Sequence, residues 1–155
     1  MLLILTAKPV LIGLHLGFAI LGIDAFLWLF SEIRSGVWRG REFKLISLGG
    51  TISFILSWLA GGYYYVIYYG NLVKPAIKKS LAPWAHNIVM ETKEHIFLFI
   101  IPIAVTVLLT MLLGEERFAK AEIKKAVMAL AILIAVLGLI IGGMGFVISA
   151  TARWG

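Results

Sequence analysis

Four long runs of apolar residues, separated by short polar segments, dominate the hydrophobic pattern of this chain. They lie at about residues 9–30, 45–70, 92–114 and 126–150. A helix that crosses a lipid bilayer needs about 20 mostly apolar residues, and each run meets that requirement. The pattern therefore predicts an all-α fold, an integral membrane four-helix bundle, in which residues 1–155 form a single transmembrane domain.

The end of the second run is rich in aromatic and basic residues. Tyrosine is enriched where spanning helices leave the bilayer, so the five tyrosines predict an outer aromatic belt. Residues 75–84 carry two lysines between prolines, which predicts a short basic segment lying on the membrane surface. The tyrosines are Tyr63, Tyr64, Tyr65, Tyr68 and Tyr69.

Composition supports a membrane protein and excludes several other classes. The 155 residues are 61% hydrophobic and only 14% charged, whereas soluble domains carry about 25% charged residues. The net charge of +6 comes from short clusters between the apolar runs. That distribution favours contact with anionic lipids and not with nucleic acid, which needs a continuous basic face. The absence of cysteine excludes disulfides, thiolate metal sites and iron–sulfur clusters.

Lysine and arginine are distributed unevenly between the two sides of the predicted bundle. The first and third connecting segments together carry eight of these residues, and the opposite side carries six. Basic connections stay preferentially on the cytoplasmic side of a membrane. We therefore expect a multi-pass protein of the cell membrane with both termini outside.

Small residues recur every four positions on the second run and again on the fourth. Such stripes let helix backbones approach closely within lipid, where hydrophobicity no longer drives helix association. We therefore expect these faces to contact neighbouring helices. The residues are Gly49, Ser53, Ser57 and Gly61 on the second run, with Gly138 and Gly142 on the fourth.

Few ionisable side chains lie within or beside the apolar runs, and each is a functional candidate because charge inside a bilayer is costly. His15 and Asp24 are nine residues apart on the first predicted helix. At 100° per residue they lie on opposite faces, and the same holds for His86 and His95. Glu91 and His95 are four residues apart and therefore share a face.

His15 and His95 are the strongest candidates for binding a cofactor. They lie at similar predicted depths on two helices that run in the same direction. A neutral imidazole is a good ligand for haem iron, zinc or copper. With Gly22 making room for a flat ring and Phe99 on the stripe of His95, the two histidines could hold haem b between helices one and three. The leading hypothesis is therefore a membrane electron-transfer protein with bis-histidine haem b.

Two other interpretations remain open. His15, Glu91, Glu94 and His95 form a histidine–carboxylate set suited to copper or zinc, in a protein that handles or transports the metal. Alternatively, the acidic residues at this helix N-terminus only complement the helix dipole and bind no metal. In that case the chain could be a cofactor-free structural membrane subunit. For Asp24 we expect a basic or hydroxyl partner on an adjacent helix of the bundle.

The stretch GLHLGFAILGIDAFLWLF, residues 13–30, resembles the first helix of small membrane proteins of the copper-resistance CopD type. It is also broadly similar to a membrane cytochrome b helix. The resemblance rests on His15, Gly17 and Gly22. It implies metal or haem handling in a bilayer, without choosing between them. We accordingly expect the lipid bilayer, and either a membrane redox partner or a second copy of the chain, as partners, and no nucleic acid.

Overall fold

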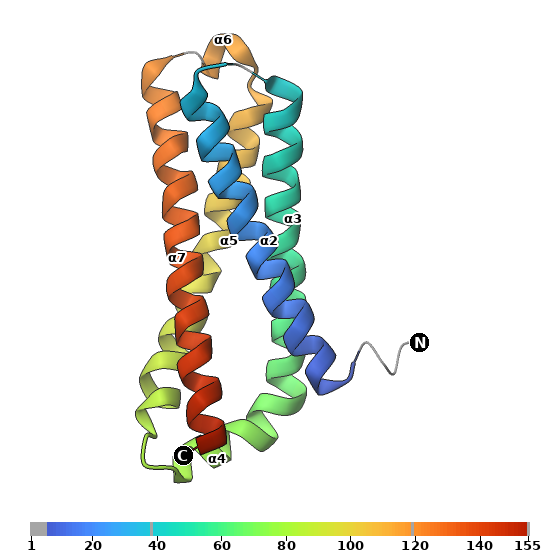
Figure 1. The fold of residues 1–155 in the computed structure, drawn as a ribbon, viewed down its shortest axis with the longest axis vertical. Helices are drawn as coiled ribbons and strands as arrows, with labels where there is room; N and C mark the ends of the chain where they lie inside the picture. Colours follow the sequence, from blue (N-terminus) through green and yellow to red (C-terminus); the bar gives the residue numbers. More distant parts are fainter. Residues whose placement is uncertain (1–5, 38, 119, 155) are drawn as a thin grey trace.

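The computed structural model describes residues 6–37, 39–118 and 120–154, which form helices joined by short connections (Figure 1). Within these residues, four helical segments are long and apolar enough to cross a membrane. The all-α four-helix architecture predicted from the apolar runs is therefore confirmed. The segments are Lys8–Ser35, Gly40–Lys79, Ala85–Leu112 and Glu122–Trp154.

The first two spans show why the chain turns where it does. Helix α2 (Lys8–Ser35) has a proline in its first turn, and it ends at Gly36, whose φ of 85° is the left-handed conformation that closes helices. The second span is one bent rod. It starts as α3 (Gly40–Tyr64), widens into the π-helical turns η1 (Tyr65–Val73) and ends as α4 (Lys74–Lys79). Residues 74–79 therefore extend the second span.

The third and fourth spans are joined by a short connection after Leu112. A short π-helix η2 (Ala85–Met90) leads into α5 (Glu91–Leu112). Gly114, with φ of 88°, then turns the chain into the single turn α6 (Glu115–Phe118), which precedes the long α7 (Ala121–Trp154). The chain reverses direction after α2 and after α5, and each reversal begins at a glycine, Gly36 or Gly114, because a positive φ is unfavourable for residues with a side chain.

The four spans form a ring in which α2 and α5 each pack against both α3 and α7. As a result α2 and α5, the first and third spans, lie diagonally across the bundle. The start of α2 and the end of α7 lie toward one end, called here the terminal end, and α6 lies at the other, the loop end (Figure 1). An apolar core fills the middle and the loop-end half. Its most deeply buried members include Phe26, Leu29, Ile100, Val107, Met111 and Ile134.

The contact between α2 and α3 is built from rings seated over glycines. A Cβ on Gly22 would lie 3.0 Å from the Phe54 ring, and a Cβ on Gly50 would lie 2.9 Å from the Phe26 ring. A Cβ on Gly61 would lie 2.6 Å from Nδ1 of His15. Ring and glycine thus alternate between the two helices, which brings their backbones close together.

The predicted small-residue stripes are only partly correct. Ser57 is buried and Gly61 receives the His15 ring, but Gly49 is exposed and a Cβ there would meet nothing within 4 Å. On α7, Gly138 packs against Ile23 of α2, whereas Gly142 is exposed and lies in open space. The contact face of α3 therefore runs through Gly50 and Phe54, one position away from the predicted Gly49 and Ser53.

Candidate functional site

Ionisable and hydroxyl side chains gather in the terminal-end half of the bundle, beyond the apolar core. They come from the first three spans or their extensions, and most are fully or partly buried. We call this group the polar cluster. Its members are His15, Ser57, Tyr65, Tyr69, His86, Glu91, Lys93 and Glu94.

His15 is held by two helices. Its Nδ1 lies 2.9 Å from the carbonyl oxygen of Ser57, and the Ser57 hydroxyl donates to the carbonyl oxygen of His15 at 2.8 Å. Because a carbonyl oxygen can only accept, Nδ1 carries the proton and Nε2 carries the lone pair. Nε2 makes no hydrogen bond to any residue that the structure describes. A histidine fixed in this way is oriented to accept a proton or bind a metal through Nε2.

Removing the Ser57 hydroxyl should loosen the contact between α2 and α3. Ser57→Ala deletes the hydrogen bond to the His15 carbonyl, and interhelical hydrogen bonds in membranes contribute about 0.6 to 1.7 kcal/mol. We expect a loss of stability in that range, measured by unfolding in detergent. Ser53→Ala is the matched control, because Ser53 lies one turn away and makes no side-chain hydrogen bond among the described residues. Equal stability of the two variants would contradict the assignment.

Lys93 and Glu94 bring opposite charges to the same region. A Cβ on Gly145 of α7 would lie 3.7 Å from Cε of Lys93, so the lysine stem crosses toward α7. Its ammonium acts electrostatically on both His15 and Glu94, and the Glu94 carboxylate lies beside the Tyr65 hydroxyl. Oε1 of Glu94 is buried and accepts no hydrogen bond from any described residue. An unsatisfied buried acceptor costs about 1–3 kcal/mol, so this oxygen favours a bound donor.

A second set of contacts leads from the interior to the surface. The Tyr69 hydroxyl lies 3.0 Å from Nδ1 of His86, which is only 2% exposed. Nε2 of His86 lies 4.0 Å from the half-exposed Glu91 carboxylate. The ring of Tyr69 stacks on that of Tyr65 with 5.1 Å between centroids. The side chains therefore form a row from Glu91 at the surface to Tyr65 inside the bundle.

The two π-helices carry three members of this row. Tyr65 and Tyr69 lie on η1, and His86 lies on η2. A π-helical turn is wider than an α-helical turn and shifts the faces of the residues that follow it, and such turns are frequent at functional sites.

The predicted aromatic belt is wrong for Tyr69, because this side chain is buried within the bundle and does not face lipid. The exposed Tyr63 fits that prediction.

The structure does not bring His15 and His95 together. His95 is exposed, and its Nδ1 lies 2.6 Å from the Glu91 carbonyl oxygen of its own helix. Phe97 is the α5 residue that approaches His15, with 6.5 Å between ring centroids. Because His95 precedes Phe97 by two residues, it points about 200° away. Phe99 is 67% exposed on the outer surface of the bundle.

The other predicted site residues are also separated. The Phe54 ring occupies the space beside Gly22, so this glycine does not make room for a cofactor. Glu91 is exposed, whereas Glu94 is half-buried beside Tyr65. Within the described part of the chain, no group of three or more histidine, aspartate or glutamate residues is arranged to hold a metal ion. Binding of haem b, copper or zinc by this chain therefore stays a prediction.

Sequence reasoning missed His86, Lys93, Tyr65 and Tyr69 as members of the site. His86 is buried and His95 is exposed, so the two do face differently, but the sequence predicts His95 as the interior member. Lys93 stands next to Glu94 at the start of a span, where it counts toward the charge of a connecting segment. No pattern in the sequence marks it as an interior side chain.

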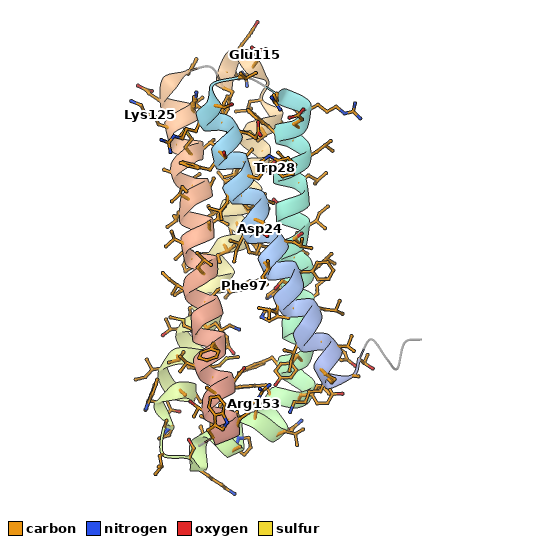
Figure 2. All side chains as sticks on the ribbon, in the orientation of Figure 1. Asp24, Trp28, Phe97, Glu115, Lys125 and Arg153 are labelled. Atoms are coloured by element: carbon orange, nitrogen blue, oxygen red, sulfur yellow. The ribbon has the colours of Figure 1, made fainter. Side chains whose placement is uncertain are left out.

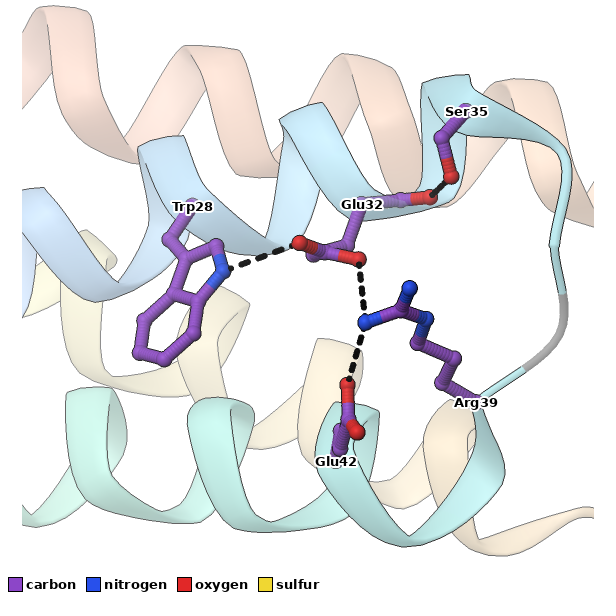
Figure 3. Close-up of polar contacts among 5 residues, drawn as sticks. All are labelled: Trp28, Glu32, Ser35, Arg39 and Glu42. Atoms are coloured by element: carbon purple, nitrogen blue, oxygen red, sulfur yellow. Dashed lines mark hydrogen bonds and ion pairs between the residues drawn. The ribbon is translucent and has the colours of Figure 1, made fainter.

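A second polar group lies at the loop end and joins α2 to α3 (Figure 3). Trp28 Nε1 donates to Glu32 at 3.2 Å, and Arg39 lies 3.7 Å from Glu32 and 3.2 Å from Glu42. The hydrogen bond to Glu42, together with the charges of Glu42 and Glu32, raises the pKa of Arg39. Because these side chains are largely exposed, we assign them to holding the short connection between the helices.

Asp24 lies apart from both groups. Its side chain is exposed on α2 near the middle of the span (Figure 2). It makes no hydrogen bond or ion pair with any residue in the described ranges. The expected basic or hydroxyl partner on an adjacent helix of the bundle is therefore not present among them.

Comparison of the chain with protein-family models, curated proteins and solved structures finds no significant match. The resemblance of residues 13–30 to CopD-type proteins and cytochrome b helices accordingly stays a prediction. The assignment of function rests on the polar cluster itself.

Proposed function

We propose that the protein binds the polar head of a small membrane-dissolved molecule in the polar cluster and exchanges protons with it from the terminal end. One observation carries the proposal. Contacts link the half-exposed Glu91 through His86 and Tyr69 to Tyr65, and the charges of Glu94 and Lys93 connect Tyr65 to His15 within the same polar cluster. Ionisable groups inside a membrane span commonly mark such proton relays.

The row leads to one face of the membrane only. Beyond His15 the bundle is filled by the rings of Phe97, Phe54 and Phe26. The buried hydroxyls of Ser47 and Thr51 donate to carbonyl oxygens within the bundle. This arrangement supports proton exchange with the terminal end, which is the outer face in the predicted topology, and argues against a path across the bilayer.

The available groups suit a particular kind of ligand. Nε2 of His15 and Oε1 of Glu94 are acceptors without described donors, and the Lys93 ammonium, whose charge acts on both residues, is a donor. A quinone presents carbonyl oxygens that accept hydrogen bonds, and its quinol presents hydroxyls that donate them. His15 is only half-buried, which allows approach from the lipid.

Conversion of a quinone to a quinol takes up two electrons and two protons. In this proposal the protons enter from the terminal end, where Glu91 and His86 lie, and the electrons come from a membrane redox partner. The proposal retains the membrane electron transfer expected from the sequence. It does not require His95.

Binding of a short-chain benzoquinone to the protein in lipid nanodiscs tests the proposal. We expect saturable quenching of tryptophan fluorescence by the quinone, with affinity at least tenfold weaker in Lys93→Met and His15→Phe. A lost hydrogen bond to a charged group is worth about 1.5–3 kcal/mol, which supports that magnitude. His95→Phe is the control and should bind as the unmodified protein does.

Two results would overturn the proposal. One is unmodified protein that shows no saturable binding. The other is a low-spin haem spectrum, or bound copper or zinc, in the purified unmodified protein, together with the absence of that haem or metal from both His15→Ala and His95→Ala. That second result would restore the two-histidine site predicted from the sequence.

A further inference from the structure

Asp24 places a carboxyl group on the lipid-facing surface of a spanning helix. Helix α2 extends from Lys8 to Ser35, so at 1.5 Å per residue Asp24 lies within about 5 Å of its midpoint. The short aspartate side chain cannot reach a membrane surface from that depth. The group is therefore surrounded by lipid unless another molecule covers it.

An uncovered carboxylate at this depth is unfavourable. An aspartate at the centre of a spanning helix costs about 2.5–3.5 kcal/mol. Neighbouring side chains on α2 donate no hydrogen bond to this carboxylate. Ile20, Leu21 and Leu27 are exposed apolar residues, and the indole N–H of Trp28 donates to Glu32 instead. No residue in the described part of the chain supplies a donor to Asp24, so we look to another molecule for one.

We propose that the Asp24 face of α2 docks against a spanning helix of a different membrane protein, and that this helix carries a lysine or arginine at the same depth. The face consists of Gly13, Gly17, Asp24 and Ser31, which all lie within about 20° of Asp24 around the helix. All four are exposed, and a Cβ on either glycine would meet nothing within 4 Å. The glycines leave room for a second backbone, and the acid selects a basic partner.

Charge complementarity decides against a second copy of this chain as the occupant. Two copies with the same orientation, packed through this face, would set Asp24 against Asp24. The fourteen lysines and arginines lie at helix ends or in connections, apart from Lys93, which lies inside the bundle. None of them can meet Asp24 near the middle of the bilayer.

A designed spanning peptide tests this proposal with the full-length protein. The peptide is built of leucine and alanine with one central lysine, and its match has leucine at that position. Energy transfer between labelled protein and labelled peptide is measured in phosphatidylcholine vesicles. We expect the lysine peptide to bind at least tenfold more tightly than the leucine peptide. Asp24→Leu should abolish that difference, and Glu122→Gln, at the loop end, should retain it.

A charge exchange completes the experiment. Asp24→Lys should bind a peptide with a central aspartate and reject the lysine peptide. Equal binding of the lysine and leucine peptides to the unmodified protein would overturn the proposal. So would energy transfer between two labelled copies of the protein that Asp24→Leu removes, because the occupant would then be a second copy. Asp24→Asn keeps the shape of the side chain and serves where Asp24→Leu does not fold.

Discussion

Gly61→Ala should destabilise the protein, and Gly62→Ala should not. The added methyl group at residue 61 would lie 2.6 Å from Nδ1 and 2.9 Å from Cε1 of His15. The ring cannot move aside freely, because Ser57 holds it through Nδ1. Overpacking of this kind costs about 1–3 kcal/mol. We expect a lower unfolding midpoint in detergent, together with the loss of ligand binding at His15.

The neighbouring glycine makes a close control for this change. Gly62 lies on the same helix, and a Cβ there would meet nothing within 4 Å. Both substitutions replace glycine by the better helix former alanine, which favours the helix by up to about 1 kcal/mol. Any difference between the variants therefore reports the contact with α2. If Gly61→Ala were as stable as Gly62→Ala, the close approach of His15 to α3 would be wrong.

Phe54→Ala should cause the largest loss of stability among the changes considered. Phe54 is 1% exposed, fills the notch at Gly22 and stacks on Phe26 with 6.0 Å between ring centroids. Truncation of a buried phenylalanine costs about 3–5 kcal/mol in cores of soluble proteins. In lipid the cavity and the lost van der Waals contacts remain. We expect at least about 3 kcal/mol, measured by unfolding in detergent.

Phe99→Ala provides the matched comparison for this prediction. Phe99 is exposed toward lipid from the neighbouring helix α5, so its truncation should change stability by less than about 0.5 kcal/mol. The same variant also addresses the haem hypothesis, in which Phe99 lines the cofactor. A loss of stability at Phe99 comparable to that at Phe54 would show that α5 presents a different face to the bundle.

Hydrophobicity along the chain was sufficient to predict the four spans and the all-α fold. Each run of about 20 apolar residues must satisfy its own backbone hydrogen bonds inside a bilayer, and a helix does so without help from distant residues. Helix periodicity put Glu91 and His95 on one face, a local relation that depends on α-helix geometry alone. His86 is buried and His95 is exposed, but the residues between them include the π-helix η2, where that period does not apply.

The exact contact face of α3 depended on packing. A strict four-residue repeat drifts by about 40° with every step around a helix, so a stripe from Gly49 to Gly61 winds across the surface. The face that meets α2 includes Gly50, Phe54, Ser57 and Gly61, with spacings that alternate between four and three. The positions of the Phe26 and His15 rings of α2 determine which glycines of α3 are covered.

The candidate site could be anticipated in part. Intramembrane histidines and carboxylates marked His15 and Glu94 from the sequence alone, because ionisable groups are rare in apolar helices. Which histidine faced inward could not be read in the same way. The diagonal placement of α2 and α5, and the π-helical turns that carry Tyr65, Tyr69 and His86, arise from how four helices pack together. Helix periodicity therefore determined which residues share a face, and only tertiary packing decided which faces meet.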